Sequence, residues 1–206
     1  MNKEDIQIVV VPTQKLFPTG EQFEGFQPVK DGSMMRTILE EFHYMRRGDA
    51  EIDPTFKQPI SYALIRNLDG DVFLYQRGSK RSEFHETRLA GKWACGIWGH
   101  IEKEDEDSGN IFEDSLMREL EEEITLDGKV LGMEPVGYIN SQKDEVSTVH
   151  IGVLYLITTD ATSATWSEEV VNEGFYSLEK AAEILDDPEK HVEEWTRIVL
   201  DYLLQE

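Results

Sequence analysis

The pattern of apolar and polar positions predicts strands and helices that alternate along the chain. Short apolar or alternating runs indicate strands, and apolar residues spaced three or four apart indicate helices. The runs predict strands at 6–11, 60–66, 71–77, 92–98, 130–140, 147–158 and 170–176. The helical spacings predict helices at 33–47, 111–125, 177–185 and from 188 towards the last residues.

Turn and capping residues bound several of these elements. The run Asn67-Leu68-Asp69-Gly70 lies between two strand patterns and predicts a hairpin. Gly48 is placed to stop the helix that starts at Ser33, Ser177 to cap a short helix, and Pro188 to open the last one. Strands with helices packed against them predict an α/β sandwich with a mixed sheet.

Residues 1–55 are predicted to form an N-terminal extension of strand, loop and helix. Its loop, at 12–32, is rich in Pro, Gly and Phe, and the segment 49–58 has the composition of a linker. We expect this extension to pack on the main domain, residues 56–206, or on a second subunit.

A helix over 111–125 would carry three carboxylates on one face. Residues three or four apart are neighbours on a helix, so Glu119, Glu122 and Glu123 point the same way. Such like charges repel by about 0.3 kcal/mol per pair. A divalent cation bound between the carboxylates would turn this repulsion into a net attraction, because Mg²⁺ and Mn²⁺ bind carboxylate and phosphate oxygens. The alternative is a solvated acidic face. The opposite face is apolar at Leu116, Leu120 and Ile124.

The residues before this helix predict its N-terminal cap and the turn and loop that lead into it. Asn110 stands at the expected N-cap, with Glu113 three residues later. Gly99 follows the strand predicted at 92–98 and is expected to allow a tight turn. The acidic run at 102–107 is predicted to be a mobile loop.

This order of glycine, acidic loop and helix resembles the Nudix box of the Nudix (MutT-type) hydrolases. The family pattern runs glycine, five residues, glutamate, seven residues, then Arg-Glu-apolar-x-Glu-Glu-x-Gly-apolar. Gly99 matches the glycine and Leu126 the last apolar position. The core of the motif is matched by Arg118, Glu119, Leu120, Glu122 and Glu123. Looser resemblance extends over 59–178.

Three features depart from the family pattern. The loop before the box helix is about five residues longer than usual. Asn110 stands where the first glutamate is expected. The carboxylate that this glutamate supplies in the family would then come from Glu102, Glu104 or Glu106. Thr125 replaces the glycine that follows the helix, where a residue with positive φ is often required.

The resemblance implies an α/β/α sandwich and a pyrophosphohydrolase that acts on acid anhydrides. Its substrate would be a nucleoside diphosphate linked to another group, attacked by water at phosphorus. Glu119, Glu122 and Glu123 would hold Mg²⁺ or Mn²⁺. Arg118 would orient one of these carboxylates rather than bind substrate, the alternative being an ordinary surface ion pair.

Further site residues are predicted from their positions around the box. Family members place the general base in the box or on a later loop, which makes Glu169 a candidate. Arg77 and Arg88 belong to a basic cluster before the glycine and are candidates to bind substrate phosphates, the alternative being a solvated loop. Gly99 and His100 would line the substrate site, although a histidine held by backbone contacts is an equal alternative.

Two other functions are known in the same fold. A Nudix-like module that binds a nucleotide without cleaving it usually loses box carboxylates, whereas this chain keeps three. Residues 89–100 also look like part of the isopentenyl diphosphate isomerases. Those enzymes carry a catalytic cysteine where this chain has Trp98, so we expect Cys95 to be a small buried residue. Segments 58–62, 86–89 and 96–101 resemble a Nudix subgroup known as predicted phosphoesterases, which identifies no substrate.

Composition limits the partners. A net charge of −22 argues against binding long nucleic acids. No apolar run approaches the roughly 20 residues that span a bilayer, and the first residues lack a signal-peptide pattern. One cysteine fits a reducing compartment. We expect a cytoplasmic protein that acts on a small phosphorylated substrate and, by family analogy, forms a homodimer.

Overall fold

The computed structural model describes residues 2–78, 90–105, 109–143, 145–166 and 170–205. Strands and helices alternate along these residues, which confirms the predicted α/β class. None of the helices described has both the length and the apolar character that a membrane crossing requires.

The elements are as follows. The strands are β1 Gln7–Pro12, β2 Gly25–Pro28, β3 His43–Arg46, β4 Phe56–Asn67, β5 Val72–Arg77, β6 Trp93–Ala94, β7 Gly96–His100, β8 Ile124–Leu126, β9 Val130–Asn140, β10 His150–Thr159, β11 Ala164–Trp166 and β12 Val170–Tyr176. The helices are α1 Thr13–Leu16, α2 Ser33–Glu41, α3 Arg47–Ala50, α4 Ile111–Glu123, α5 Glu145–Val149, α6 Leu178–Asp186 and α7 Glu194–Leu203, with short 3₁₀ turns η1 Lys3–Asp5 and η3 Lys103–Asp105.

The chain divides into two compact units. The first comprises Met1–Tyr62, Trp98–Glu119 and Pro135–Tyr155. The second comprises Ala63–Ile97, Leu120–Glu134 and Leu156–Glu206. The elements β4, β7, β9, β10 and α4 contribute residues to both units.

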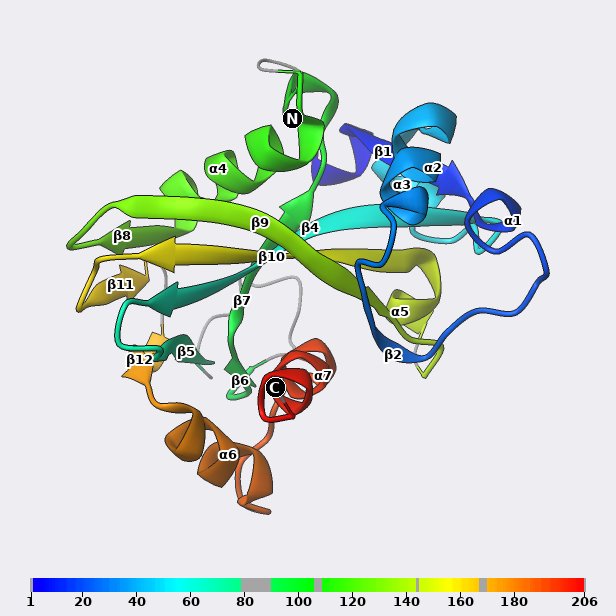
Figure 1. Cartoon of the computed structure of the whole chain (residues 1–206). Coiled ribbons are helices and arrows are strands. Elements are labelled where there is room, and N and C mark those ends of the chain that lie inside the picture. Colours follow the sequence, from blue (N-terminus) through cyan, green and yellow to red (C-terminus); the bar gives the residue numbers. More distant parts are fainter. Residues whose placement is uncertain (1, 79–89, 106–108, 144, 167–169, 206) are drawn as a thin grey trace. The chain divides into compact units, whose positions relative to one another are not determined.

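The first unit contains the N-terminal strand β1. This strand pairs antiparallel with β3 and, through Val11 and Pro12, with the start of β4. Ile8, Val10 and Ala50 form a buried cluster beside it. The elements α1 and α2 contact β1 and each other, and Figure 1 shows them together in blue. The strands β4, β10, β9 and β2 are hydrogen-bonded in that order.

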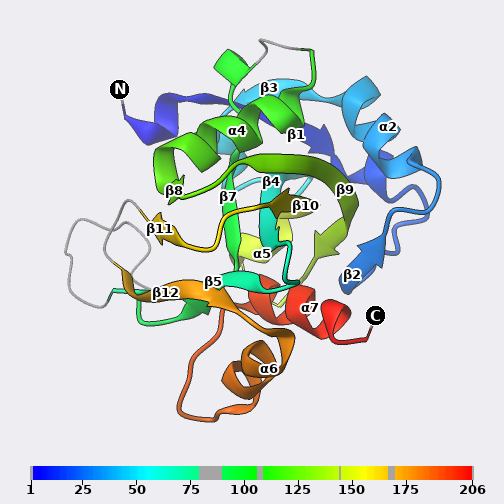
Figure 2. The ribbon, with the colours of Figure 1, turned by 60° about the vertical axis from the view of Figure 1, so that its left-hand side comes forward.

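The second unit is organised around β5. Its antiparallel partner β12 runs along its whole length, from Val72 opposite Tyr176 to Arg77 opposite Val170. The strands β4 and β6 also pair with β5. The helix α6 contacts both α7 and β5, as Figure 2 shows, and β8 and β11 form a separate two-stranded sheet.

The helix predicted at 33–47 is wrong beyond Glu41. After α2 the chain becomes extended, and residues His43 to Arg46 pair with Val10 to Gln7 of β1. Met45, expected on the helical stripe, packs instead against the cluster around Ile8. Strand pairing therefore overrides a helical spacing that is only a local preference.

The start predicted for the last helix is also wrong, because α7 begins at Glu194 rather than at Pro188. After a turn at 188–190, residues 191–193 are held extended against β6. The amide of Trp93 donates to the carbonyl of His191 at 2.8 Å, and the amide of Glu193 donates to the carbonyl of Trp93 at 3.0 Å. Because these residues bond to a backbone partner distant in sequence, the helix begins later in the chain than its local sequence predicts.

Segments predicted as loop or linker also carry regular structure. The loop at 12–32 contains α1 and β2, while the linker at 49–58 contains the end of α3 and the start of β4. The strand predicted from residue 147 begins only at His150, after α5. Other boundaries are confirmed: β9 and β12 span 130–140 and 170–176 as predicted, and the Ser177 side chain caps α6.

The predicted hairpin after β4 is confirmed, and Asn67 holds it closed. Its side-chain oxygen accepts hydrogen bonds from the amides of Asp69 at 3.0 Å and Asp71 at 2.9 Å. Gly70 has a φ of 88°, a conformation that favours glycine.

We predict that Asn67→Ala destabilises the protein by about 1–3 kcal/mol, because two turn amides lose their acceptor in a partly buried setting. Urea unfolding followed by circular dichroism measures the change. Asn172→Ala, which removes one exposed side-chain hydrogen bond to Gln76, is the matched control and should cost less. Equal losses for the two variants would contradict this account of the turn.

Candidate functional site

The guanidinium of Arg118, on α4, joins three segments of the first unit. Its Nε lies 2.7 Å from Asp105 Oδ1, and one terminal nitrogen lies 2.6 Å from Glu119 Oε1. The other terminal nitrogen donates to Asp105 Oδ2 and to the carbonyl oxygen of His100, both at 3.1 Å. Burial alone would lower the pKa of Arg118, but Asp105 and Glu119 raise it above its ordinary value. The group is therefore a fixed positive charge that holds Glu119 in one orientation.

Gly99 lies inside β7 and forms no turn, which corrects the prediction for this residue. The structure gives another reason for glycine here. A Cβ built at this position would overlap the Cγ, Cδ and Oε1 atoms of Glu119. The missing side chain thus makes room for the carboxylate that Arg118 holds.

Asp105 is the residue that sequence reasoning missed. It is 5% exposed, it lies at the end of η3, and it pairs with Arg118. The family glutamate was placed at Asn110 by counting back from the Arg-Glu pair, across a lengthened loop. In the family pattern five residues separate the glycine from the acid, and the residue that follows the five after Gly99 is Asp105. The described start of the acidic run is therefore an ordered turn rather than a mobile loop.

The predicted capping of α4 is confirmed. The Asn110 carbonyl accepts from the Asp114 amide at 2.9 Å, and its side chain accepts from the Glu113 amide at 3.5 Å. The predicted apolar face is buried as well. Its residues are Leu116, Leu120 and Ile124.

The glutamates of the box differ in exposure. Glu119 and Glu123 are partly buried, and Glu122 is exposed. After Glu123 the chain passes directly into β8, where Thr125 lies opposite Thr165 of β11. No non-glycine residue among those described has a positive φ. A helix that continues into a paired strand does not need the glycine that the family pattern has there.

Arg77, in the second unit, is held by an ion pair. Its Nε lies 2.6 Å from Glu193 Oε1, and a terminal nitrogen donates to the Tyr75 hydroxyl at 3.0 Å. Burial opposes the charge of Arg77, but Tyr75, Glu193 and Glu123 raise its pKa above the ordinary value. Its guanidinium is thus already engaged at the end of β5, although Glu123 of the box is close enough to influence it.

The other candidate residues have different positions. Arg88 and Glu169 lie outside the described residues. Cys95 is 1% exposed, which confirms the prediction of a small buried residue, and its amide donates to Thr196 Oγ1 at 3.1 Å. His100 ends β7 as a buried side chain rather than in a turn.

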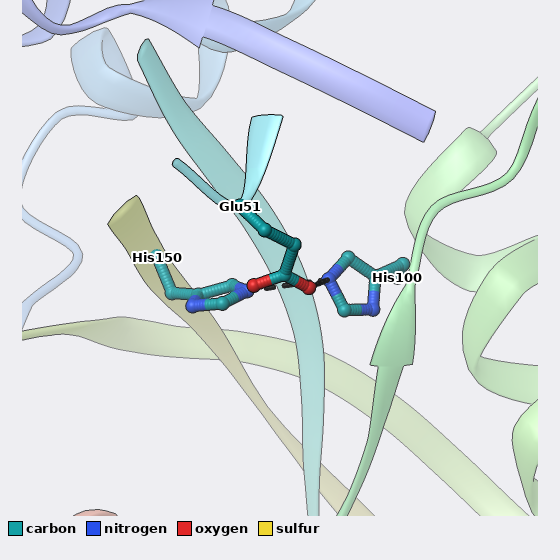
Figure 3. Close-up of side chains that lie close together, drawn as sticks. All are labelled: Glu51, His100 and His150. Carbon is teal, nitrogen blue, oxygen red and sulfur yellow. Dashed lines mark hydrogen bonds and ion pairs between the residues drawn. The ribbon is translucent and has the colours of Figure 1, made fainter. Parts of the chain in front are cut away.

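The imidazole of His100 belongs to a second cluster in the first unit. Ligand atoms of Glu51, His100 and His150 all lie within 4.8 Å of one another (Figure 3). Sequence reasoning missed this cluster because its members come from three distant segments with no common spacing. Among the described residues, this is the group of three His or acidic side chains whose ligand atoms meet that spacing, and the carboxylates of Glu119, Glu122 and Glu123 do not.

Known proteins resemble this chain over nearly its whole length. Protein YmaB of Bacillus subtilis (strain 168) is 30% identical over 209 residues, covering 98% of this chain and 100% of that protein. In structure the chain is similar to Tm1382, described as a Nudix hydrolase, with a TM-score of 0.77, 28% identity and coverage of 97% of this chain and 98% of that one. This likeness confirms the predicted fold.

A more distant likeness is to the NUDIX domain of Shewanella oneidensis NrtR, whose structure was determined with ADP ribose. It is 18% identical, with a TM-score of 0.49 and coverage of 73% of this chain and 89% of that one. No protein-family model matches the chain.

We predict that Gly99→Ala expels the Glu119 carboxylate from its place over β7 and breaks its bond to Arg118. The added methyl group overlaps that carboxylate, and overpacking of this kind costs about 1–3 kcal/mol. A crystal structure of the variant and urea unfolding measure the two effects. Gly132→Ala is the control, since a Cβ there meets nothing within 4 Å. An unmoved Glu119 with unchanged stability would refute the packing argument.

We also predict that Glu193→Ala destabilises the protein by about 2–3 kcal/mol, because Arg77 then keeps a largely buried charge without its carboxylate. Chemical unfolding gives the value. Adding Arg77→Met to this variant should restore part of the loss, since no unpaired charge then remains. Glu183→Ala, which breaks an exposed pair with Lys180, should have little effect. A double variant less stable than Glu193→Ala alone would contradict the prediction.

Proposed function

This chain belongs to the Nudix superfamily, and we propose that it hydrolyses a phosphoanhydride bond in a small nucleoside-diphosphate-linked substrate with the help of Mg²⁺ or Mn²⁺. The observation that carries the proposal is the setting of Glu119. Its carboxylate lies over Gly99 of β7 and is held by Arg118 at 2.6 Å. A single box carboxylate is thus fixed before any cation or substrate arrives.

The residues of α4 suit a hard cation. Glu122 and Glu123 follow Glu119 by three and four residues, so helical spacing puts all three carboxylates on one face. Mg²⁺ and Mn²⁺ prefer oxygen ligands, usually a few carboxylates together with substrate phosphates. We propose these three glutamates as the metal ligands. The Gly99 position supports this role, because a side chain there would fill the space that Glu119 occupies.

The chemistry follows from charge and positioning. When bound, the cation would neutralise the charge that builds on phosphate oxygens and would lower the pKa of a coordinated water. The part of this chain is to hold the ligands in place. Arg118 is a positioning residue, because it contacts Glu119, Asp105 and the His100 carbonyl and leaves substrate contacts to other groups.

Substrate contacts of the basic cluster remain part of the proposal. On the basis of the sequence alone, we propose that Arg88 binds substrate phosphates and that Glu169 is the general base. Arg77 would act near the substrate only while paired with Glu193. The cytoplasmic location and the homodimer stay predictions, as does the boundary between residues 55 and 56.

We predict that Glu122→Gln lowers kcat by about a hundred- to a thousandfold, because it removes charge that helps to hold the cation. The assay is release of phosphate or nucleotide from nucleotide sugars, dinucleoside polyphosphates, ADP-ribose and nucleoside triphosphates, with Mg²⁺ and with Mn²⁺. Glu121→Gln is the matched control. Its side chain is exposed on the same helix and points away from the Glu119 face.

The outcomes separate the proposal from its alternatives. Turnover by Glu122→Gln at the parent rate would refute the metal assignment. Tight nucleotide binding without turnover of any substrate would favour a binding module. Conversion of isopentenyl diphosphate would favour an isomerase, which the burial of Cys95 already argues against.

A further inference from the structure

Two buried imidazoles of the first unit face each other through their Nε2 atoms. His100, the last residue of β7, and His150, the first residue of β10, have these nitrogens 3.2 Å apart. Both residues are 6% exposed. In the view of Figure 3 the carboxylate of Glu51 overlies the line between the two ring nitrogens, and its Oε1 lies 3.7 Å from His100 Nε2. The three groups therefore point their potential ligand atoms at one small volume.

The spacing of these atoms fits a transition-metal ion. A zinc ion binds histidine nitrogen at about 2.0–2.1 Å with tetrahedral angles, which puts two such nitrogens about 3.3 Å apart. The two Nε2 atoms already have nearly this separation. The carboxylate oxygen lies within 4.8 Å of both nitrogens, so a small movement of Glu51 completes a set of three ligands.

The protonation of the rings is also suited to an ion. His150 Nδ1 lies 2.7 Å from the carbonyl oxygen of Val146, which can only accept a hydrogen bond, so Nδ1 carries the hydrogen and Nε2 of the neutral ring carries the lone pair. Two neutral imidazoles with facing nitrogens need one shared donor proton or one cation between them.

Gln58 adds an independent sign that something polar belongs here. Its Oε1 lies 2.9 Å from His100 Nε2 and accepts a hydrogen bond from it, so binding of an ion at this nitrogen requires the ring hydrogen of His100 to stand on Nδ1. Its Nε2 is buried and has no hydrogen-bond partner among the described residues. An unsatisfied buried donor of this kind indicates a missing acceptor. A water molecule held as the fourth ligand of an ion would provide that acceptor.

The backbone around the cluster is fixed in advance. Lys57, itself buried, donates from Nζ to the carbonyls of Ser147 at 3.3 Å and His150 at 3.2 Å. The carbonyl of His100 is held by Arg118 and by Ser115 Oγ. Ligands on rigid strand ends of this kind reduce the entropy that an ion must overcome to bind.

We propose that Glu51, His100 and His150 form a site for a divalent transition-metal ion of the zinc type, separate from the carboxylates of α4. Two nitrogen ligands favour such an ion over Mg²⁺, which prefers oxygen. The ion enters beside Glu51, whose side chain is 33% exposed, and displaces the contact of Arg47 Nε with Glu51 Oε1 at 3.3 Å. The proposal does not depend on the hydrolysis of a nucleotide.

The first test is zinc titration of the full-length, EDTA-treated protein by calorimetry, with Co²⁺ as a spectroscopic substitute. The wild type should bind one Zn²⁺ that millimolar Mg²⁺ does not displace, and Co²⁺ should give visible absorption bands of a nitrogen-ligated site. Glu51→Gln should weaken zinc binding by about tenfold or more, since even outer-shell changes cost about 10–100-fold. Unfolding without metal checks that this variant is folded.

Two variants control for other zinc sites. His191→Gln removes an exposed histidine of the second unit and should leave zinc affinity unchanged. Glu122→Gln, in the box, should also retain the ion. Loss of zinc binding in Glu122→Gln together with its retention in Glu51→Gln would overturn the proposal, and so would a wild type that binds no zinc. Failure here would leave the proposed hydrolysis intact, because that rests on α4.

A second measurement needs no variant. In ¹H–¹⁵N spectra of the histidine rings, addition of zinc to the wild type should shift the Nε2 signals of His100 and His150. The signals of the exposed His191 should stay in place. Unshifted signals of the buried pair at saturating zinc would overturn the assignment of these ligands.

Discussion

The site depends on one partly buried guanidinium and the three groups it holds. Arg118 ties the η3 turn through Asp105, the helix α4 through Glu119, and the end of β7 through the His100 carbonyl. A charge in this position costs desolvation, and the two carboxylates offset that cost. The same contacts fix a carboxylate against a strand that has no side chain at Gly99. Fold stability and the proposed chemistry thus rest on shared hydrogen bonds.

Much of the fold could be predicted because local patterns agree with distant pairing. The strands β9 and β12 have the bounds that the sequence predicted, and the predicted Ser177 side chain caps α6. The predictions that were wrong are those where a distant backbone decides. Residues 43–46 have a helical spacing but pair with β1, and Val192 is held extended by Trp93. Neither partner is visible in a window of local sequence.

The candidate site divides in the same way. The helical face of α4 follows from spacing alone, so its glutamates were found from the sequence. Asp105 was missed because an insertion made the count from the Arg-Glu pair misleading. Glu51, His100 and His150 have no shared spacing, since they meet only when α3, β7 and β10 come together. Clusters assembled by tertiary structure carry no local signal.

His100 has two faces that serve different neighbours. Its imidazole is directed at Glu51 and His150, while its carbonyl accepts from Arg118. One peptide unit therefore lies between the buried histidine pair and the residue that orients Glu119. Thermodynamic linkage is reciprocal. If a ligand of the histidine cluster orders the His100 peptide unit, then ordering of the Arg118–Glu119 pair must raise the affinity for that ligand. Coupling between the histidine cluster and the Arg118–Glu119 pair would need no moving domain, only a change in the freedom of His100.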